Sequence, residues 1–176
     1  PLKLPDMKYM IIGGVAGGAS TAARLRRLDE QAEIILFEKG EYISYANCGL
    51  PYYIGGVIEE RERLFVQTPE SFKARFNIEV RIKSEVKAIE PENKQVVIKD
   101  WATGKTYRES FDKLVLSPGA EPVLPPWEGI RTEGIFTLRN VADTDRIKAW
   151  AGRQEVKKAV VVGAGFIGLE MAENLH

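Results

Sequence analysis

Cys48 is the residue of this chain best suited to redox chemistry, and it is the only cysteine among 176 residues. It lies in the segment 44–56, where Asn47 is a suitable N-cap and Pro51 is tolerated in a first helical turn, so we expect Cys48 to open a short helix. A helix N-terminus favours the thiolate, the nucleophilic form of cysteine. The alternative is an inert buried cysteine, the commoner state of a lone thiol. Because an internal disulfide needs a second cysteine, a reactive Cys48 must pair with an external thiol or be oxidised to sulfenic acid.

A glycine fingerprint near the end of the chain predicts a nucleotide site. Residues 163–168 read GAGFIG, which matches GxGxxG directly after an apolar strand pattern and before a helix. Such glycines permit a tight turn, close approach of the backbone to a pyrophosphate and close helix–strand packing, and the helix then offers free N–H groups to phosphate. The alternative is a tight turn without a ligand.

A variant of this fingerprint, GGVAGG, occupies residues 13–18, with Val15 in the place of the second glycine. Glu38 ends a buried strand pattern 20 residues after Gly18, where a carboxylate can accept hydrogen bonds from a ribose. Taken alone, Glu38 could also be an ordinary solvated strand end. Two such turns 150 residues apart predict two nucleotides, as in an enzyme that moves electrons from one cofactor to another.

The elements that must position these groups follow an α/β pattern. Strands at 8–13 and 34–37 flank a helix at about 17–28, which makes a βαβ unit. Residues 40–67 are loop-like, and Thr68 followed by Pro69 predicts the start of a short helix. Further strands are predicted at 84–90, 94–100 and 106–111, as a β-meander with a turn at 102–104, and a buried strand is predicted at 113–116.

The C-terminal third begins with a linker-like stretch, 119–134. Asn140 then caps a helix that ends near residue 151, and a strand at 158–163 followed by a helix starts a second βα unit. A βα unit without its second strand cannot cover its apolar face, so we expect the sequence to stop inside a second domain. At the other end, we expect Met7 to be the natural start and residues 1–6 to be an extension.

Charge and hydropathy exclude several other classes of protein. Lys and Arg number 25 and Asp and Glu number 25, so the chain lacks the basic excess of a general nucleic-acid binder. No apolar run approaches the ~20 residues that span a bilayer, and the first residues form no secretory signal. We expect a cytoplasmic protein with a small-molecule substrate and without a nucleic-acid, membrane or metal partner.

With these motifs, the whole chain resembles the N-terminal portion of the flavoprotein pyridine nucleotide–disulfide oxidoreductases. Within them it is most similar to the coenzyme A-disulfide reductases, including the type fused to a rhodanese domain. Residues 13–18, 44–56, 114–120 and 163–168 carry the resemblance. It implies a doubly wound, Rossmann-like fold with the β-meander inserted, and a homodimer for the full-length protein. The domains implied are an FAD-binding domain over 7–120, a connector over 121–156 and the truncated start of an NAD(P)-binding domain over 157–176.

The resemblance also implies FAD at the first glycine turn and NAD(P)H at the second, with Cys48 forming a mixed disulfide with coenzyme A. Ser44 and Asn47 are implied to line the thiol-substrate site. On the first helix, Ser20, Arg24 and Arg27 share one face, and the resemblance favours coenzyme A phosphates as their ligand over a solvated basic stripe. The implied cofactor contacts are Gly13, Gly14, Val15, Ala16, Gly17, Gly18, Glu38, Lys39, Ser117, Pro118, Gly119, Gly163, Gly165 and Gly168.

Three departures limit the resemblance. Tyr45 stands where the family has Phe in its Ser-Phe-x-x-Cys motif, Val15 interrupts the first glycine turn, and the chain ends before the later segments of the family. The substrate stays open among coenzyme A disulfide, a persulfide and a polysulfide. The alternative functions are an NADH oxidase of the same family and a non-catalytic fragment. Peroxidase relatives have a histidine where this chain has Ala16, which disfavours that activity.

Overall fold

The structure, a computed structural model, describes residues 7–176, and the predicted extension at residues 1–6 lies outside this range. The chain divides into two compact units. Unit 1 comprises the described residues up to Tyr45 together with Phe65–Gly119, and unit 2 comprises Ala46–Leu64 together with Ala120–His176. The predicted domain boundaries near residues 120 and 156 stay predictions.

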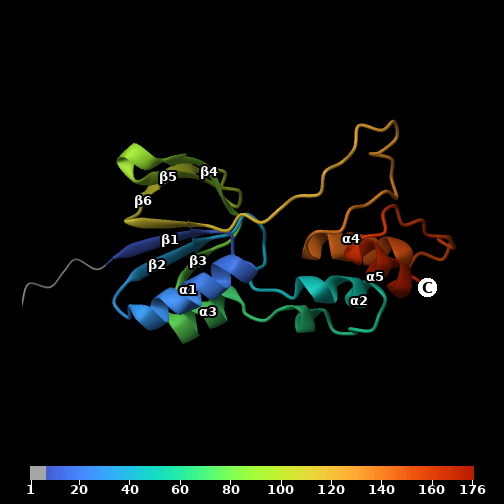
Figure 1. The fold of residues 1–176 in the computed structure, drawn as a ribbon, viewed down its shortest axis with the longest axis horizontal. Helices are drawn as coiled ribbons and strands as arrows, with labels where there is room; N and C mark the ends of the chain where they lie inside the picture. The colour runs from blue at the N-terminus through green and yellow to red at the C-terminus, as the bar shows by residue number, and fades with distance from the viewer. Residues whose placement is uncertain (1–6) are drawn as a thin grey trace, which may run out of the picture. The chain divides into compact units, whose positions relative to one another are not determined.

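A four-stranded parallel sheet forms the middle of unit 1 (Figure 1), in the order β3-β2-β1-β7. The predicted βαβ unit is confirmed as β1, α1 and β2. The sequence analysis did not identify β3, because a strand of three residues is too short to show a period of its own. The elements of this layer are β1 (Lys8–Ile12), α1 (Ala16–Leu28), β2 (Glu33–Phe37), α3 (Pro69–Phe76), β3 (Glu79–Arg81) and β7 (Lys113–Leu116).

A three-stranded antiparallel meander covers the face of the sheet opposite α1 and α3 (Figure 1). The meander was predicted and is confirmed, with a 3₁₀ turn at Pro91–Asn93 between its first two strands. The predicted start of α3 is also confirmed, because Thr68 caps it through a capping box with Ser71 and Pro69 is its first residue. The strands of the meander are β4 (Ser84–Glu90), β5 (Gln95–Asp100) and β6 (Thr106–Ser110).

The sheet of unit 1 is buried on both faces, which explains its continuous apolar runs. Alternate residues of β1 and β2 point to opposite sides. Ile11 and Leu36 pack in a cluster with the alanines of α1 and with Phe72 of α3. Met10, Ile35 and Phe37 pack with Val96 and Ile98 of the meander in a second cluster. The parallel sheet therefore has a hydrophobic core on each of its two faces.

Unit 2 is built from short helices. The helix α4 begins after Asn140, whose side chain accepts a hydrogen bond from the N–H of Asp143, as predicted. Arg61 forms an ion pair with Asp145 at 2.7 Å and thereby ties residues 61–64 to α4. No helix within residues 7–176 combines the length and hydropathy required of a membrane span. The elements of unit 2 are the 3₁₀ turns Asn47–Gly49 and Arg61–Leu64, with α2 (Leu50–Ile54), α4 (Val141–Ala151) and α5 (Phe166–Asn174).

Two predicted strands differ from the structure. Residues 158–163 form no strand, because a strand needs a neighbour to pair with and unit 2 contains none among the described residues. Val160 and Val162 are consequently 88% and 78% exposed. The strand at 113–116 does form as β7, but it is not buried: it is an edge strand that pairs only with β1, and Leu116 at its end is exposed.

Candidate nucleotide and thiol sites

The first glycine turn closes through contacts that only glycine allows. Gly13 has a φ of +96°, a conformation that other residues rarely adopt. A Cβ on Gly13 would lie 1.9 Å from the carbonyl oxygen of Ser117, and a Cβ on Gly18 would lie 1.7 Å from that of Gly13. The turn therefore brings α1 and the end of β7 against the end of β1.

The N-terminus of α1 is open to an anion. Val15 occupies the N-cap position, no side chain caps the helix, and its first turn contains no acidic residue. Ala16 and Gly17 in this first turn are exposed. Because the first N–H groups of a helix lack partners and carry the positive end of its dipole, a pyrophosphate fits here. Val15 thus departs from the fingerprint without disturbing the turn.

Glu38 lies beside this turn, immediately after β2. Its two carboxylate oxygens accept hydrogen bonds from the N–H of Gly14 at 2.8 Å and from the N–H of Gly40 at 2.7 Å. A carboxylate has about four acceptor positions, so these two bonds leave capacity for the hydroxyls of a ribose. Lys39 is exposed next to it. The structure thus brings Glu38 and the first glycine turn together; their role as ligands stays a prediction.

The predicted contacts at the end of β7 lie at the same edge of the sheet. A Cβ on Gly17 would lie 3.3 Å from the hydroxyl of Ser117, and Pro118 and Gly119 are exposed. Ser44 also reaches this turn, because its N–H donates to the carbonyl of Gly14 at 2.8 Å. These contacts assemble at the carboxyl ends of parallel strands, where ligands of open α/β sheets bind.

The predicted basic face of α1 is present. Ser20, Arg24 and Arg27 are all exposed, whereas Gly18 and Ala22 on the opposite side are buried. Arg27 also donates to the carbonyl of Ala23 at 3.1 Å. Binding of phosphate groups to this face stays a prediction.

Arg26 is a residue of α1 that the sequence analysis passed over. Its guanidinium donates to the carbonyls of Phe76 at 2.8 Å and Asn77 at 2.9 Å, at the end of α3, and to those of Asp29 and Glu30 at the end of α1. A cation is favoured at the C-terminus of a helix, and here it serves two helices. Arg26 differs from the exposed Arg24 and Arg27 only in the side of α1 from which it projects, and this was the signal in the sequence that could have identified it.

Cys48 is the middle residue of the 3₁₀ turn Asn47–Gly49, in unit 2, and its thiol is free and exposed. The alternative of a buried cysteine is therefore wrong. The N-cap is Ala46, not Asn47 as predicted, because Asn47 already belongs to the turn and its side chain makes no capping bond. The side-chain oxygen of Asn47 is buried without a hydrogen-bond partner among the described residues, so its acceptor is not used for capping.

The second glycine turn has the local geometry of the first. Gly163 has a φ of +106°, and a Cβ on Gly168 would lie 2.1 Å from the carbonyl oxygen of Gly163. The helix α5 begins after Gly165 without a side-chain cap and without acidic residues in its first turn. The predicted nucleotide contacts Gly163, Gly165 and Gly168 are thus arranged as a fingerprint turn, although the preceding strand is absent.

Comparison with known proteins places this geometry in a family. The family model described as pyridine nucleotide-disulphide oxidoreductase matches residues 7–176. The coenzyme A disulfide reductase of Staphylococcus haemolyticus is 44% identical over 169 residues, which are 96% of this chain and 38% of that protein. The chain therefore spans little more than a third of that relative.

Solved structures of similar proteins support the same family assignment. The crystal structure of reduced Bacillus anthracis CoADR-RHD matches with a TM-score of 0.95 and 56% identity, over 98% of this chain and 31% of that one. A NAD-dependent persulfide reductase from A. fulgidus has a TM-score of 0.91 and 39% identity, over 96% and 32% of the two chains. The water-forming NADH oxidase from Lactobacillus brevis, bound to NADH, has a TM-score of 0.91 and 30% identity, over 97% and 37%. The predicted α/β fold is confirmed by these matches.

Proposed function

Because this chain belongs to the pyridine nucleotide-disulphide oxidoreductase family, we propose that the full-length protein is an NAD(P)H-dependent, FAD-containing reductase of coenzyme A disulfide or of a related persulfide or polysulfide. The observation that carries this proposal is the exposed thiol of Cys48, in a chain without a second cysteine. Within residues 1–176 such a thiol has no disulfide partner, and its exposure leaves it open to a disulfide with a small-molecule thiol. The similarity to a coenzyme A disulfide reductase supports coenzyme A as that partner.

The first glycine turn is the proposed site of FAD. Its residues fit the group: the uncapped N-terminus of α1 suits the pyrophosphate, and the Glu38 carboxylate suits the ribose hydroxyls. When bound, FAD supplies a carrier for the two electrons that pass from NAD(P)H to a disulfide. The second turn, at Gly163 and Gly168, is the proposed site of the NAD(P)H pyrophosphate.

Cys48 is the proposed nucleophile. Its thiolate attacks one sulfur of coenzyme A disulfide, the sulfur–sulfur bond breaks, and one coenzyme A leaves as a thiolate while the other stays as a mixed disulfide with Cys48. Two electrons and protons from solvent then release the second coenzyme A as a thiol and restore Cys48. Overall, one disulfide, one NAD(P)H and one proton give two thiols and one NAD(P)⁺.

Ser20, Arg24 and Arg27 are the proposed contacts of the coenzyme A phosphates. They are exposed on one face of α1, and arginine forms charge-assisted, bidentate bonds with phosphate. Ser44 and Asn47 are proposed to line the thiol end of this site.

Replacing the thiol tests the proposal. In the full-length protein, Cys48→Ser should abolish reduction of coenzyme A disulfide, because serine cannot form the mixed disulfide, while FAD stays bound. The measurement is NAD(P)H consumption with coenzyme A disulfide, together with the flavin absorbance of the purified variant. A serine variant that reduces the disulfide at a near wild-type rate would contradict the mechanism.

An NADH oxidase is the second candidate, favoured by the 30% identity to the Lactobacillus brevis enzyme. An oxidase of this kind would cycle Cys48 through sulfenic acid. Mass spectrometry of the non-reduced full-length protein separates the two. An adduct of coenzyme A mass on Cys48 supports the disulfide reductase, and a single-oxygen adduct alone supports the oxidase.

A further inference from the structure

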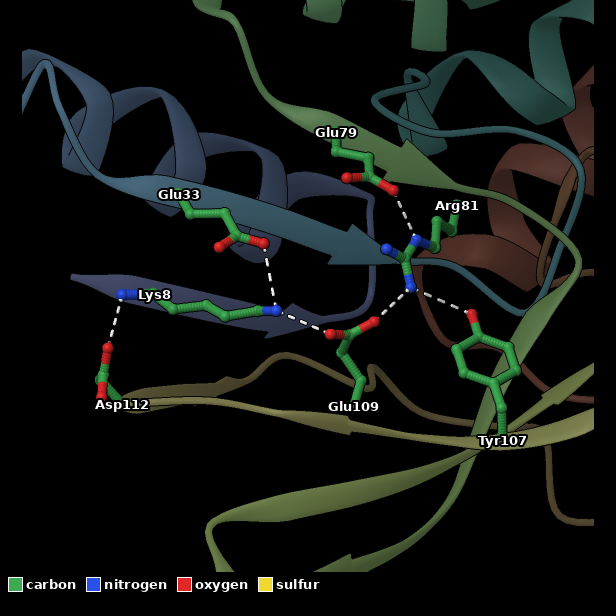
Figure 2. Close-up of polar contacts among 7 residues, drawn as sticks. All are labelled: Lys8, Glu33, Glu79, Arg81, Tyr107, Glu109 and Asp112. Carbon is green, nitrogen blue, oxygen red and sulfur yellow. Dashed lines mark hydrogen bonds and ion pairs between the residues drawn. The ribbon is translucent and has the colours of Figure 1, made fainter. Parts of the chain in front are cut away.

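A cluster of charged side chains lies between the parallel sheet and the meander of unit 1 (Figure 2). The Lys8 ammonium contacts Glu109 at 2.6 Å and Glu33 at 3.1 Å. The Arg81 guanidinium contacts the other oxygen of Glu109 at 2.8 Å and Glu79 at 2.6 Å. One carboxylate of the meander, Glu109, is therefore shared by a cation from β1 and a cation from β3.

These charges are substantially shielded from water. The side chains of Lys8, Arg81 and Glu109 are only 19%, 26% and 21% exposed. Burial alone would raise the pKa of Glu109, but the hydrogen bonds and charges of Lys8 and Arg81 outweigh it and lower the pKa. Glu109 therefore stays ionised at neutral pH, and its contact with Arg81 is a charge-assisted one.

The Arg81 guanidinium has further contacts with aromatic side chains. Besides the two carboxylates, it donates to the hydroxyl of Tyr107 at 3.2 Å. Its Cζ lies 5.3 Å from the ring centre of Phe37 and 5.8 Å from that of Tyr107, distances at which a cation is attracted to an aromatic ring. Phe37 is fully buried and directly precedes Glu38.

The backbone of Arg81 holds the backbone of Glu38. Arg81 ends β3, a strand of three residues at the edge of the sheet that pairs only with β2. Its carbonyl accepts the N–H of Glu38 at 3.0 Å, and the carbonyl of Glu38 accepts the N–H of Ser84 at 3.0 Å. A strand of three residues at an edge forms few hydrogen bonds with its neighbour. The contacts of the Arg81 side chain with Glu109 and Tyr107 therefore help to hold the end of β3 in place.

We propose that Arg81 is a positioning residue for the carboxylate of Glu38, which it holds at the first glycine turn from the opposite side of the sheet. The inference rests on the proposed FAD site, because Glu38 is the group proposed there for the ribose. None of the contacts described for the Arg81 side chain reaches that site. It acts through the main chain at the end of β2, and the meander thereby takes part in binding the cofactor.

The affinity for FAD of the full-length protein tests this. Arg81→Gln should weaken FAD binding about tenfold, roughly the loss of one charge-assisted hydrogen bond, measured as the Kd from flavin fluorescence after removal and readdition of FAD. The matched control is Arg108→Gln, which removes an exposed arginine of β6 and breaks its ion pair, at 3.0 Å, with Glu90 of β4 in the meander. The control should bind FAD within twofold of the wild type. Arg81→Lys keeps the charge without the planar fork and should lie between the two; it serves in place of Arg81→Gln should that variant not fold.

A double-mutant cycle separates positioning from a general structural role. If Arg81 acts through Glu38, removing Arg81 should matter little once Glu38 is gone. The Kd for FAD of the double variant Glu38→Gln/Arg81→Gln should therefore lie within twofold of the Kd of Glu38→Gln alone. Losses that multiply, or an Arg81→Gln or Arg81→Lys variant with wild-type affinity, would overturn the inference. A wild-type protein that binds no FAD would instead overturn the proposed flavin site, so the two failures are distinguishable.

Discussion

The turns at residues 13–18 and 163–168 share their backbone geometry and differ in what surrounds them. Gly13 and Gly163 have φ values of +96° and +106°, and the last glycine of each turn, Gly18 or Gly168, packs on the carbonyl of the first. Around the first turn, Met10 and Ile11 are fully buried in a sheet with a layer on each face. Before the second, the valines at 160 and 162 are exposed and form no strand.

This comparison shows that the turn depends on neighbouring residues, whereas the strand before it depends on residues far away in the sequence. A glycine turn depends mainly on the conformations that a few consecutive residues can adopt, and it forms in both units. A strand needs backbone partners that lie elsewhere in the chain, and β1 has β2 and β7 while residues 158–162 have none among the described residues. Turns of the same geometry therefore follow a paired, buried strand in unit 1 and an unpaired segment in unit 2.

The largest expected effect concerns turnover. We expect the chain of 176 residues to consume neither NADH nor NADPH, even with added FAD, because no strand of residues 7–176 pairs with the segment before the second turn to support a nicotinamide site there. The measurement is nicotinamide absorbance over time, with the full-length protein as the positive control. Steady consumption that depends on this purified chain would show that the second turn is functional without its strand.

Alanine at the last glycine of each turn, Gly18 or Gly168, compares the two turns directly. At Gly18 the new Cβ would meet backbone at 1.7 Å inside a packed layer, so Gly18→Ala should lower the free energy of unfolding by about 2–4 kcal/mol. At Gly168 the contact is 2.1 Å, but the exposed turn can shift without displacing a sheet, so the loss should stay below about 1 kcal/mol. Urea unfolding of both variants measures this. Equal losses would mean that the second turn is as firmly supported as the first.

The same division explains what could be predicted from the sequence. The glycine turns, the capping of α3 by Thr68 and of α4 by Asn140, and the face of α1 depend on neighbouring residues and are confirmed. The N-cap at Ala46 differs from the prediction by one residue, because the segment begins as a 3₁₀ turn rather than an α-helix.

The cluster around Arg81 and Glu109 could not be predicted. These residues are 28 positions apart, and each is an ordinary charged residue in its own strand. Their meeting depends on how the meander covers the sheet, which no local pattern encodes. The roles of the glycines, Glu38 and Cys48 toward cofactor and substrate remain predictions.

The helices after the two turns also differ in charge, which predicts a difference in phosphate binding. Arg24 lies six residues after Gly18, whereas Asn174 lies six residues after Gly168. In the full-length protein, replacing both Arg24 and Arg27 by Ala should raise the KM for coenzyme A disulfide at least ~10-fold, because each charged hydrogen bond contributes ~1.5–3 kcal/mol. The KM for polysulfide, which has no phosphate, should barely change.

Arg108→Ala is the control for that substitution, since it removes an exposed arginine from the meander. Equal losses on both substrates would mean that Arg24 and Arg27 support the fold. An unchanged KM for both would leave them as surface charge.

The smallest expected effect concerns the stability of unit 1 in acid. The charged cluster joins the parallel sheet that carries the first turn to the meander, and no such cluster is described around the second turn. The pKa of Glu109 is lowered in the folded protein, so its contribution to stability is present above the unfolded value, about 4.3, and is lost as the pH falls through the folded value. Glu109→Gln should therefore lower the free energy of unfolding by roughly 1–2 kcal/mol at neutral pH, and by progressively less as the pH falls, until variant and wild type converge. Urea unfolding at a series of pH values measures this. The control is Glu90→Gln, for which the loss at neutral pH should be smaller because Glu90 pairs with the exposed Arg108 and not with two shielded cations. A difference between Glu109→Gln and wild type that stays constant down to the lowest pH would show that Glu109 acts through packing and not through its charge, and the cluster would then be no electrostatic link between sheet and meander.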